Sequence, residues 1–303
     1  MPGRLLSIGE CMVELSQAGE GLLRRGFAGD TFNTAWYARA CLPADWAVDY
    51  LTALGDDPMS TEMLTFMKEA GIGTQAIRRI PGKTPGLYLI TLKNGERTFS
   101  YWRDTAAARK LADDADHLRQ QIERADIVYF SGITLGILTP EANDTLLAEL
   151  RRAKAAGKRV AFDPNLRPRL WTDKETMLKT ISDGARAASL VLPSFDDETT
   201  HFGDGSVAET IARYHDLGVD GVVVKNGEHG ATISFGGEAI HVPAVAAPQV
   251  VDTTSAGDSF NGGFLSRLVR GASPQDAAAY GTAVASIVIR HHGALISPAL
   301  LPG

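Results

Sequence analysis

The sequence predicts an α/β protein with a central, mostly parallel β-sheet flanked by helices and a small separate β-sheet. Three observations predict this fold. Short apolar runs that suit buried strands alternate with amphipathic segments of helical period through the middle of the chain. A hairpin interrupts that alternation, because an Asn-Gly pair joins two runs rich in strand-forming residues. Near the C-terminal end, small residues precede a further helical segment, as they do at anion-binding helix starts.

The first strand–helix unit lies in the middle of the chain. Ile127–Phe130 is an apolar, partly β-branched run that predicts a buried strand. Thr139–Glu141 predicts a helix start, with Thr as the cap, Pro in the first turn and an acid near the positive end of the helix dipole. Gly157 ends this helix, and Arg159–Phe162 predicts the next strand. The apolar face of the helix is formed by Leu146, Leu147 and Leu150.

The same pattern is repeated further along the chain. Leu190–Leu192 and Val222–Val224 predict strands, and Val207–Leu217 predicts the helix between them. Strands joined through helices by short links favour a parallel sheet with both faces covered. Ligands bind such sheets beyond the carboxyl ends of the strands. The segments Asp163–Asn165 and Lys225–Gly227 are therefore well placed for chemistry.

The hairpin lies within Gly86–Arg103 and turns at Asn94-Gly95. Pairing outward from the turn sets Leu92 opposite Arg97, Ile90 opposite Phe99, and Tyr88 opposite Tyr101. Alternation along the strands then predicts one shared face for Tyr88, Ile90, Phe99, Tyr101 and Arg103. A free hairpin of this size is marginally stable, so we expect it to join strands from Met12–Phe27 in a small lid sheet. The alternative is a meander at the edge of the main sheet.

These elements predict two parts of the chain. We expect the α/β core to comprise residues 1–11, 31–84 and 105–303 and the β lid to comprise residues 12–30 and 85–104. A chain of 303 residues buries enough surface to fold without disulfides or metal staples. Its two cysteines, Cys11 and Cys41, suggest no disulfide framework and fit a reducing cytoplasm.

The charge balance argues against a nucleic-acid partner, although it leaves room for a small basic pocket that binds an anionic metabolite. Thirty Lys and Arg face thirty-six Asp and Glu, which gives a net charge of −6 with no basic block. We therefore expect no nucleic-acid partner held by bulk electrostatics. The first residues carry polar side chains every few positions, so we expect neither a signal peptide nor a membrane anchor.

The segment Val250–Phe264 carries the strongest chemical signal. The small residues Ser255–Gly257 let successive backbone N–H groups point at an anion where a helix begins. Asp258 would lie beside that anion, kept ionised because the helix dipole and the N–H donors lower its pKa. It could then accept a proton from a substrate hydroxyl. On spacing alone, an equal alternative is that Asp258 only caps a helix after a tight turn.

Two motifs resemble those of the ribokinase-like (pfkB-type) carbohydrate kinases. Asp252–Asp258, DTTSAGD, resembles the C-terminal signature of the family, and Gly29–Ala35, GDTFNTA, resembles its N-terminal glycine motif. A closer similarity, to the bacterial 2-keto-3-deoxygluconate kinases of this family, is carried by four stretches: Gly9–Leu15, Gly26–Ala35, Tyr101–Arg103 and Asp163–Trp171. The resemblance implies a ribokinase-like fold and phosphoryl transfer from ATP, with Mg²⁺, to 2-keto-3-deoxygluconate.

The resemblance also implies roles for individual residues. Asp258 is the implied general base, and the amides of Ser255, Ala256 and Gly257 form the anion hole. The implied substrate-binding residues are Gly29, Asp30, Asn33, Tyr88, Tyr101, Arg103, Arg167 and Asp258. The implied ATP-binding residues are Asn165, Ser194, Lys225, Gly227, Gly230 and Tyr280. No metal ion bound directly by the protein is implied.

Several of these positions have alternatives. Arg167 is the implied partner of the sugar acid's carboxylate, but without the resemblance Arg169 could equally be the anion ligand. Gly227 and Gly230 could serve only a turn, and Tyr88 and Tyr101 could serve only lid packing or dimer contacts.

The chain also departs from the family pattern. Ala28 and Ser255 replace commoner glycines, and Ser255 is tolerable if its φ is negative. Ser194 and Asp197 stand where relatives often have Asn and Glu.

Other functions are open at this stage. A neutral-sugar kinase, such as a fructokinase, would not need the arginine pair Arg103 and Arg167. A non-catalytic sugar-binding regulator would not need Asp258. An exposed apolar face on the lid would favour a homodimer.

Overall fold

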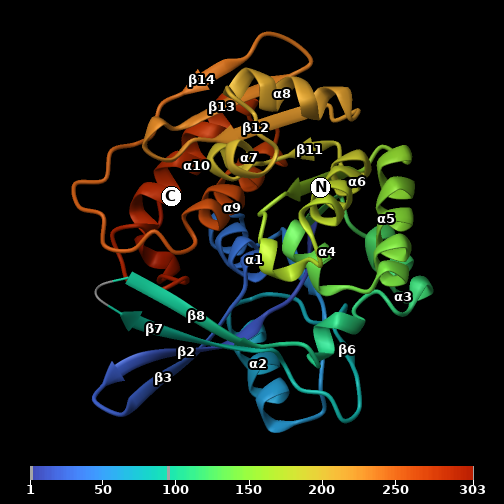
Figure 1. Ribbon diagram of the computed structural model, residues 1–303, viewed down its shortest axis with the longest axis vertical. Coiled ribbons are helices and arrows are strands. Elements are labelled where there is room, and N and C mark those ends of the chain that lie inside the picture. Colours follow the sequence, from blue (N-terminus) through green and yellow to red (C-terminus); the bar gives the residue numbers. More distant parts are fainter. Residues whose placement is uncertain (1–2, 94–95, 303) are drawn as a thin grey trace.

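The computed structural model describes residues 3–93 and 96–302 (Figure 1). Its centre is an eight-stranded sheet in the order β14-β13-β12-β11-β10-β9-β1-β4. The bounds of these strands are β1 Arg4–Ile8, β4 Ala47–Leu51, β9 Ile127–Ser131, β10 Arg159–Asp163, β11 Leu190–Val191, β12 Gly221–Lys225, β13 Ala231–Phe235 and β14 Ile240–Val242. Within this sheet, β4, β1, β9, β10, β11 and β12 run parallel to one another, while β13 and β14 join antiparallel at one edge. This confirms the predicted fold class.

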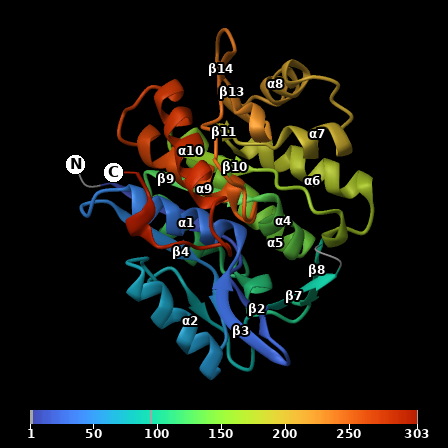
Figure 2. The same ribbon diagram turned by 90° about the vertical axis from the view of Figure 1, so that its left-hand side faces the viewer.

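Helices cover both faces of this sheet (Figures 1 and 2). Side chains of α3, α4, α5, α6 and α8 build the core on one face, and side chains of α1, α2, α9 and α10 build it on the other. The α-helices are α1 Asp30–Cys41, α2 Pro58–Glu69, α3 Ala115–Glu123, α4 Gly132–Ile137, α5 Pro140–Ala155, α6 Lys174–Ala187, α7 Phe195–His201, α8 Val207–Asp216, α9 Ala256–Leu268 and α10 Pro274–Val288. The 3₁₀ turns are η1 Ala107–Lys110, η2 Pro168–Leu170, η3 Gly227–His229 and η4 Pro298–Leu300.

The local start and stop signals in the middle of the chain are confirmed. Thr139 caps α5 by accepting a bond from the N–H of Ala142, and Pro140 occupies the first turn. Gly157, just past the end, has φ 79°, the left-handed value that glycine adopts most easily. Helix α4 was not predicted, because it follows β9 without a loop and is only six residues long.

A second sheet of four strands, in the order β3-β2-β7-β8, stands apart from the core (Figure 1). Its strands are β2 Met12–Gly19, β3 Leu22–Ala28, β7 Leu87–Lys93 and β8 Glu96–Trp102. The register pairs Tyr88 with Tyr101 and Ile90 with Phe99, as predicted. Because β7 also pairs with β2, the alternative of a meander on the main sheet is wrong. The predicted turn at 94–95 lies outside the described residues. A two-stranded sheet of β5 Ala53–Leu54 and β6 Arg78–Arg79 completes the fold.

The predicted shared face of the lid hairpin is confirmed by ring contacts. The Tyr88 and Tyr101 rings lie 5.9 Å apart between centroids, and the Phe99 ring lies 6.3 Å from that of Tyr101. The guanidinium of Arg103 lies over the Tyr101 ring at 5.8 Å. The opposite face of the lid turns toward α2, where Arg25 of β3 forms an ion pair with Glu62.

A buried ionic cluster joins α7 to α8 at the far side of the core. Arg213 donates to Glu198 at 2.5 Å and to Asp204 at 2.6 Å. Its guanidinium also lies between two rings, 3.8 Å from the Phe202 centroid and 4.4 Å from that of Tyr214. Glu198 is fully buried, so its charge depends on this single arginine for compensation.

None of the described helices is long and apolar enough to span a bilayer.

We predict that Arg213→Met lowers the free energy of unfolding by about 3–5 kcal/mol, because it leaves two buried carboxylates without their cation. Urea unfolding followed by circular dichroism measures the change. The matched control is Arg186→Met, since Arg186 pairs with Asp183 on an exposed helix face and should cost less than about 1 kcal/mol. Equal effects of the two substitutions would contradict the role assigned to the cluster.

Candidate active site

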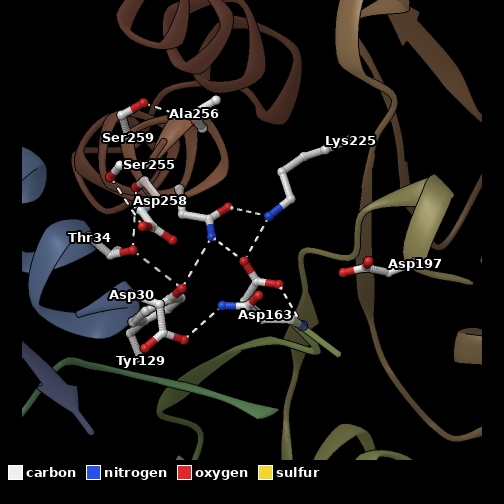
Figure 3. Close-up of polar contacts among 12 residues, drawn as sticks. Asp30, Thr34, Tyr129, Asp163, Asp197, Lys225, Ser255, Ala256, Asp258 and Ser259 are labelled. Atoms are coloured by element: carbon white, nitrogen blue, oxygen red, sulfur yellow. Dashed lines mark hydrogen bonds and ion pairs between the residues drawn. The ribbon is translucent and has the colours of Figure 1, made fainter. Parts of the chain in front are cut away.

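The predicted site residues converge where parallel strands of the core sheet end (Figure 3). The start of α1 contributes Asp30 and Asn33, and the start of α9 contributes Asp258. The ends of β10 and β12 contribute Asp163 and Lys225. Helix α1 packs against α9, which brings together two motifs that lie more than two hundred residues apart.

Asp258 lies in the first turn of α9 and is held by neighbouring donors. The side-chain amide of Asn33 donates to its Oδ2 at 2.9 Å, and the Ser255 hydroxyl donates to the same oxygen at 3.1 Å. The hydroxyl of Thr34 donates to the Asp258 carbonyl at 3.3 Å. These bonds fix the carboxylate over the end of the sheet and leave Oδ1 available to a ligand.

The expectation that the helix dipole keeps the pKa of Asp258 low is wrong. Burial is the largest cause that raises its pKa, to about 7, and the negative charges of Asp30 and Asp163 add to the effect. The bond from Asn33 and the charge of Lys225 oppose it without cancelling it. Desolvation of a whole charge outweighs the partial charge of a helix terminus. The carboxyl is therefore poised to exchange a proton near neutral pH.

The small-residue turn before α9 also differs from the expectation. Ser255 has φ 64°, in the left-handed region, so the negative φ that would make serine easily tolerated at this position is not adopted. A non-glycine residue there is strained, which explains why glycine suits this position better. The N–H of Ala256 donates to the Thr253 carbonyl at 3.1 Å, so that amide is already engaged. The amides of Gly257 and Asp258 have no preceding carbonyl within the helix, so these two, rather than that of Ala256, are available to an anion.

A cation faces this helix start. The ammonium of Lys225 lies 2.7 Å from Asp163 Oδ2 and donates to Asn261 Oδ1 at 3.2 Å. A Cβ placed on Gly257 would lie 3.4 Å from the same ammonium, so the backbone of Gly257 looks onto Lys225. An anion seated between them would contact both the positive charge and the N–H groups.

Asn261 is a site residue that the sequence reasoning missed. It is fully buried, and its amide donates to Asp163 at 2.6 Å and to the Tyr129 hydroxyl at 3.1 Å. The signal was available, because Asn261 follows Asp258 by three positions and so lies on the same face of α9. It fixes the Asp163 carboxylate, which in turn holds Lys225.

A hydrogen bond joins Asp30, a predicted substrate-binding residue, to Asn165, a predicted nucleotide-binding residue. Asn165 donates to Asp30 Oδ2 at 2.8 Å, and its own backbone is in the left-handed region with φ 34°. Burial raises the pKa of Asp30 above its usual value, and bonds from Ser131 and Asn165 oppose the rise. Asp30 therefore lies inside the site rather than on its rim.

Gly29 owes its identity to close packing. A Cβ at this position would lie 2.1 Å from the Glu10 carbonyl oxygen, so a larger residue would push the two segments apart. The Gly29 N–H donates to Asn33 Oδ1 at 3.2 Å, which orients that side chain toward Asp258.

Glu10 lies in the link between β1 of the core and β2 of the lid. Its carboxylate forms a buried ion pair with Arg103 at the end of β8. Burial raises the pKa of Glu10, and the charge of Arg103 opposes the rise. Glu10 Oε1 and Arg103 Nε are both buried without a partner in the described part of the chain. This pair, which the sequence reasoning missed, connects the lid to the core. Tyr88, on the same lid face, donates its hydroxyl to Glu14.

The structure engages the two arginines after β10 differently. Arg167 lies 3.5 Å from Asp197 in the first turn of α7. Arg169 lies over the lid's Tyr101, 5.1 Å from the ring centroid.

Three further predicted nucleotide-binding residues lie around Lys225 at the end of β12. Ser194 pairs with Lys225 across a short parallel bridge. Gly227 and Gly230 have φ 52° and 88°, and a Cβ on Gly230 would lie 2.1 Å from the Val242 carbonyl oxygen. The tight turn between β12 and β13 therefore requires Gly230, whatever ligand lies beside it.

Tyr280 is not brought to this cluster. Its hydroxyl donates to the Pro302 carbonyl at 2.6 Å, and the guanidinium of Arg267 covers its ring at 3.9 Å. Its position on α10 turns it toward Cys41 and the C-terminal segment, because neighbouring helical positions such as Gly281 and Val284 face α9.

The arrangement places the half-buried carboxyl of Asp258, the start of α9 and the ion-paired ammonium of Lys225 close together. Such a set can remove a proton from a hydroxyl and stabilise an anionic group that the resulting oxygen attacks. In the described part of the chain, no three His, Cys, Asp or Glu side chains come together as a metal cage. Asp163 and Asp197 are the carboxylates near Lys225, and oxygen ligands of this kind suit a hydrated divalent cation.

Comparison with known proteins gives a family. Residues 3–300 match the pfkB family of carbohydrate kinases. The 2-dehydro-3-deoxygluconokinase of Dickeya dadantii is 46% identical over 302 residues, with 97% of each protein covered. The 2-dehydro-3-deoxygluconokinase of Escherichia coli K12 is 41% identical over 309 residues, with 100% of each covered.

Solved structures share the fold. A fructokinase from Xylella fastidiosa with bound ATP superposes with a TM-score of 0.85 at 23% identity, and the match covers 100% of this chain and 96% of that one.

We predict that Asp258→Asn raises the free energy of unfolding at pH 8 by about 3 kcal/mol. The pKa of Asp258 is higher in the folded state than in the unfolded state. The protein therefore loses stability as pH rises from about 4 to about 7 and this carboxyl ionises. The amide carries no such cost, and the gain should shrink at pH 5. Urea unfolding at both pH values measures it, with Asp113→Asn at an exposed position as the control. A loss of stability at pH 8 would show that the burial of Asp258 is compensated by contacts that its charge requires.

Proposed function

This chain belongs to the pfkB family of carbohydrate kinases, and we propose that it transfers the γ-phosphoryl group of ATP to 2-keto-3-deoxygluconate. The relatives' name writes the same sugar acid as 2-dehydro-3-deoxygluconate. The product is 2-keto-3-deoxy-6-phosphogluconate. The observation that carries the proposal is Asp258, a half-buried carboxyl whose pKa is raised to about 7, beside a helix start that faces Lys225.

In the proposed reaction, Asp258 accepts the proton of the sugar's primary hydroxyl. That oxygen forms a bond to the γ-phosphorus, and the bond between this phosphorus and the bridging oxygen of ADP breaks. The amides of Gly257 and Asp258 and the ammonium of Lys225 would stabilise the negative charge on the transferred group. Asn33 and Ser255 hold the base in place through their bonds to Oδ2.

Mg²⁺ bound together with the nucleotide would supply positive charge that offsets the charge of the phosphates. The carboxylates of Asp163 and Asp197 would hold such a cation, because oxygen ligands suit a hydrated divalent ion. Within the protein, Asn261 and Lys225 hold Asp163 ready for that role.

Recognition of the sugar acid is proposed for the residues around Asp258 and for the lid. Gly29, Asp30 and Asn33 would contact hydroxyl groups at the end of the sheet. Tyr88, Tyr101 and Arg103 would cover the substrate from the lid face on which the hairpin register aligns the two tyrosines. Arg167 would pair with the carboxylate of the sugar acid, because its planar guanidinium suits that ion. On the nucleotide side, the proposed residues are Asn165, Ser194, Lys225, Gly227 and Gly230.

Two finer features complete the proposal. A homodimer through the lid is supported by large apolar side chains that the lid leaves exposed, Leu22 at 65%, Leu23 at 51% and Trp102 at 58%. A cytoplasmic location is supported by the use of ATP and by two cysteines that are both free.

The proposed base predicts the pH dependence of activity. Because the pKa of Asp258 is raised to about 7, the carboxylate that accepts the proton is lost as pH falls below that value. We expect kcat/KM to fall about tenfold per pH unit between pH 6 and 5 and to level off above about pH 8. The profile is measured at saturating Mg·ATP, so that protonation of the nucleotide does not contribute. A level profile from pH 5 to 8 would rule out Asp258 as a base with this pKa.

The proposed substrate predicts the outcome of a sugar panel. ADP release is measured with Mg·ATP and 2-keto-3-deoxygluconate, fructose, ribose or no sugar. We expect the keto acid to give the highest kcat/KM, and Asp258→Asn to lower kcat on it by about 10²–10⁴. A preference for fructose would make the protein a neutral-sugar kinase. A folded protein that turns over no sugar would instead be a non-catalytic sugar-binding regulator.

A further inference from the structure

Lys225 can offer an anion only the N–H groups that the protein itself does not use. Its ammonium carries three N–H donors. Among the described residues it has two acceptors, Asp163 Oδ2 at 2.7 Å and Asn261 Oδ1 at 3.2 Å. One N–H therefore remains. Gly257 lies beside the same ammonium, since a Cβ placed on it would be 3.4 Å from Nζ, so this last N–H is available to an anion at the start of α9.

The side-chain amide of Asn261 can be oriented in one way. Its Nδ2 donates to Asp163 Oδ2 at 2.6 Å and to the Tyr129 hydroxyl at 3.1 Å, which uses both of its N–H groups. Its Oδ1 accepts from Lys225. Turning the amide over would set its oxygen against the carboxylate and its NH₂ group against the ammonium, and both contacts would repel. Because an amide donates and accepts at once, it satisfies the carboxylate and the ammonium together.

The surroundings of Asn261 hold this amide rigidly. The side chain is fully buried on α9. Helix α9 lies in close contact with α1, because a Cβ on the neighbouring Gly262 would lie 2.8 Å from the Thr34 carbonyl oxygen. The Tyr129 hydroxyl that accepts from Asn261 lies 3.3 Å from the Thr34 hydroxyl, so it is fixed by α1 as well. The amide is thus held by its own helix and by a buried hydroxyl of β9.

We infer that Asn261 is a positioning residue that aims the remaining N–H of Lys225 at the terminal phosphoryl group of the bound nucleotide. The inference rests on the proposed function, since it takes the start of α9 beside Lys225 as the place of that group. Without Asn261, the ammonium would keep its ion pair with Asp163 but would be free to rotate about it. Asn261 therefore acts through Lys225 rather than by binding substrate itself.

The first test measures binding without turnover. Wild type, Asn261→Ala and Asn261→Asp are titrated by calorimetry with Mg·ADP and with Mg·AMP-PNP, an unreactive analogue of ATP that adds the terminal phosphoryl group. Asn261→Ala should weaken AMP-PNP about tenfold and ADP by less than about threefold, because AMP-PNP alone carries a group for the aimed N–H. Asn261→Asp keeps the shape of the side chain but repels Asp163, so it should weaken AMP-PNP at least as much.

The matched control is Phe264→Leu. Phe264 is a fully buried core residue one turn further along the same face of α9. Its substitution should lower Tm, because it leaves space in the core, without changing the relative affinities for the two nucleotides. Circular dichroism checks the fold of every variant, and Asn261→Asp carries the test if Asn261→Ala does not fold.

The second test asks whether Asn261 acts through Lys225. Asn261→Ala should lower kcat with 2-keto-3-deoxygluconate by about 10- to 100-fold, while the KM for the sugar changes by less than about threefold. In the Lys225→Ala background, the same substitution should lower kcat by less than about threefold further, because no ammonium remains to be aimed.

The outcomes separate this inference from the proposed function. The inference is overturned if Asn261→Ala weakens ADP and AMP-PNP equally, if it lowers kcat by the same factor with and without Lys225, or if Phe264→Leu has the same effects. Sugar turnover by wild type together with any of these results would leave the proposed function standing. If wild type phosphorylates no sugar, the proposed function fails, and the calorimetric comparison still decides the role of Asn261.

Discussion

The crowding of carboxylates at one end of the core sheet is the constraint on which the rest of the site depends. Asp30, Asp163 and Asp258 meet there because three separate segments end at the same edge. Burial and the neighbouring negative charges disfavour the ionised forms of Asp30 and Asp258. Lys225 and the amides of Asn33, Asn165 and Asn261 offset that cost, and each of these donors reaches a specific carboxylate oxygen. The site therefore needs all these donors in position before it can hold charge.

This constraint makes the active site locally destabilising, and packing in the surrounding fold offsets that cost. Ser255 takes a left-handed φ of 64° so that its hydroxyl reaches Asp258. Glu10 and Arg103 are buried with one polar atom each left without a partner in the described chain. Strain and incomplete pairing of this kind persist where tight packing around them leaves no alternative. The two apolar cores on the faces of the sheet supply that packing.

Much of the fold and part of the site could be predicted from the sequence, because the signals are local. Caps, glycine stops and apolar periods gave α5, α8 and the strands between them, and an Asn-Gly pair with alternating neighbours gave the register of β7 and β8. Helix α4 was not predicted, because it is short and follows a strand directly. The site role of Asn261 was not predicted, because it depends on contacts with residues of distant strands.

The sequence by itself determined which residue types stand at the strand ends and helix starts, and hence the class of chemistry they can perform. Only the tertiary structure decided their electrostatic state and their partners. The pKa of Asp258 rises rather than falls because burial beside Asp30 and Asp163 outweighs a helix terminus, and burial arises only when distant segments pack together. Likewise, Arg167 and Arg169 are alike in sequence, but one turn of backbone sends the first to Asp197 and the second to the lid.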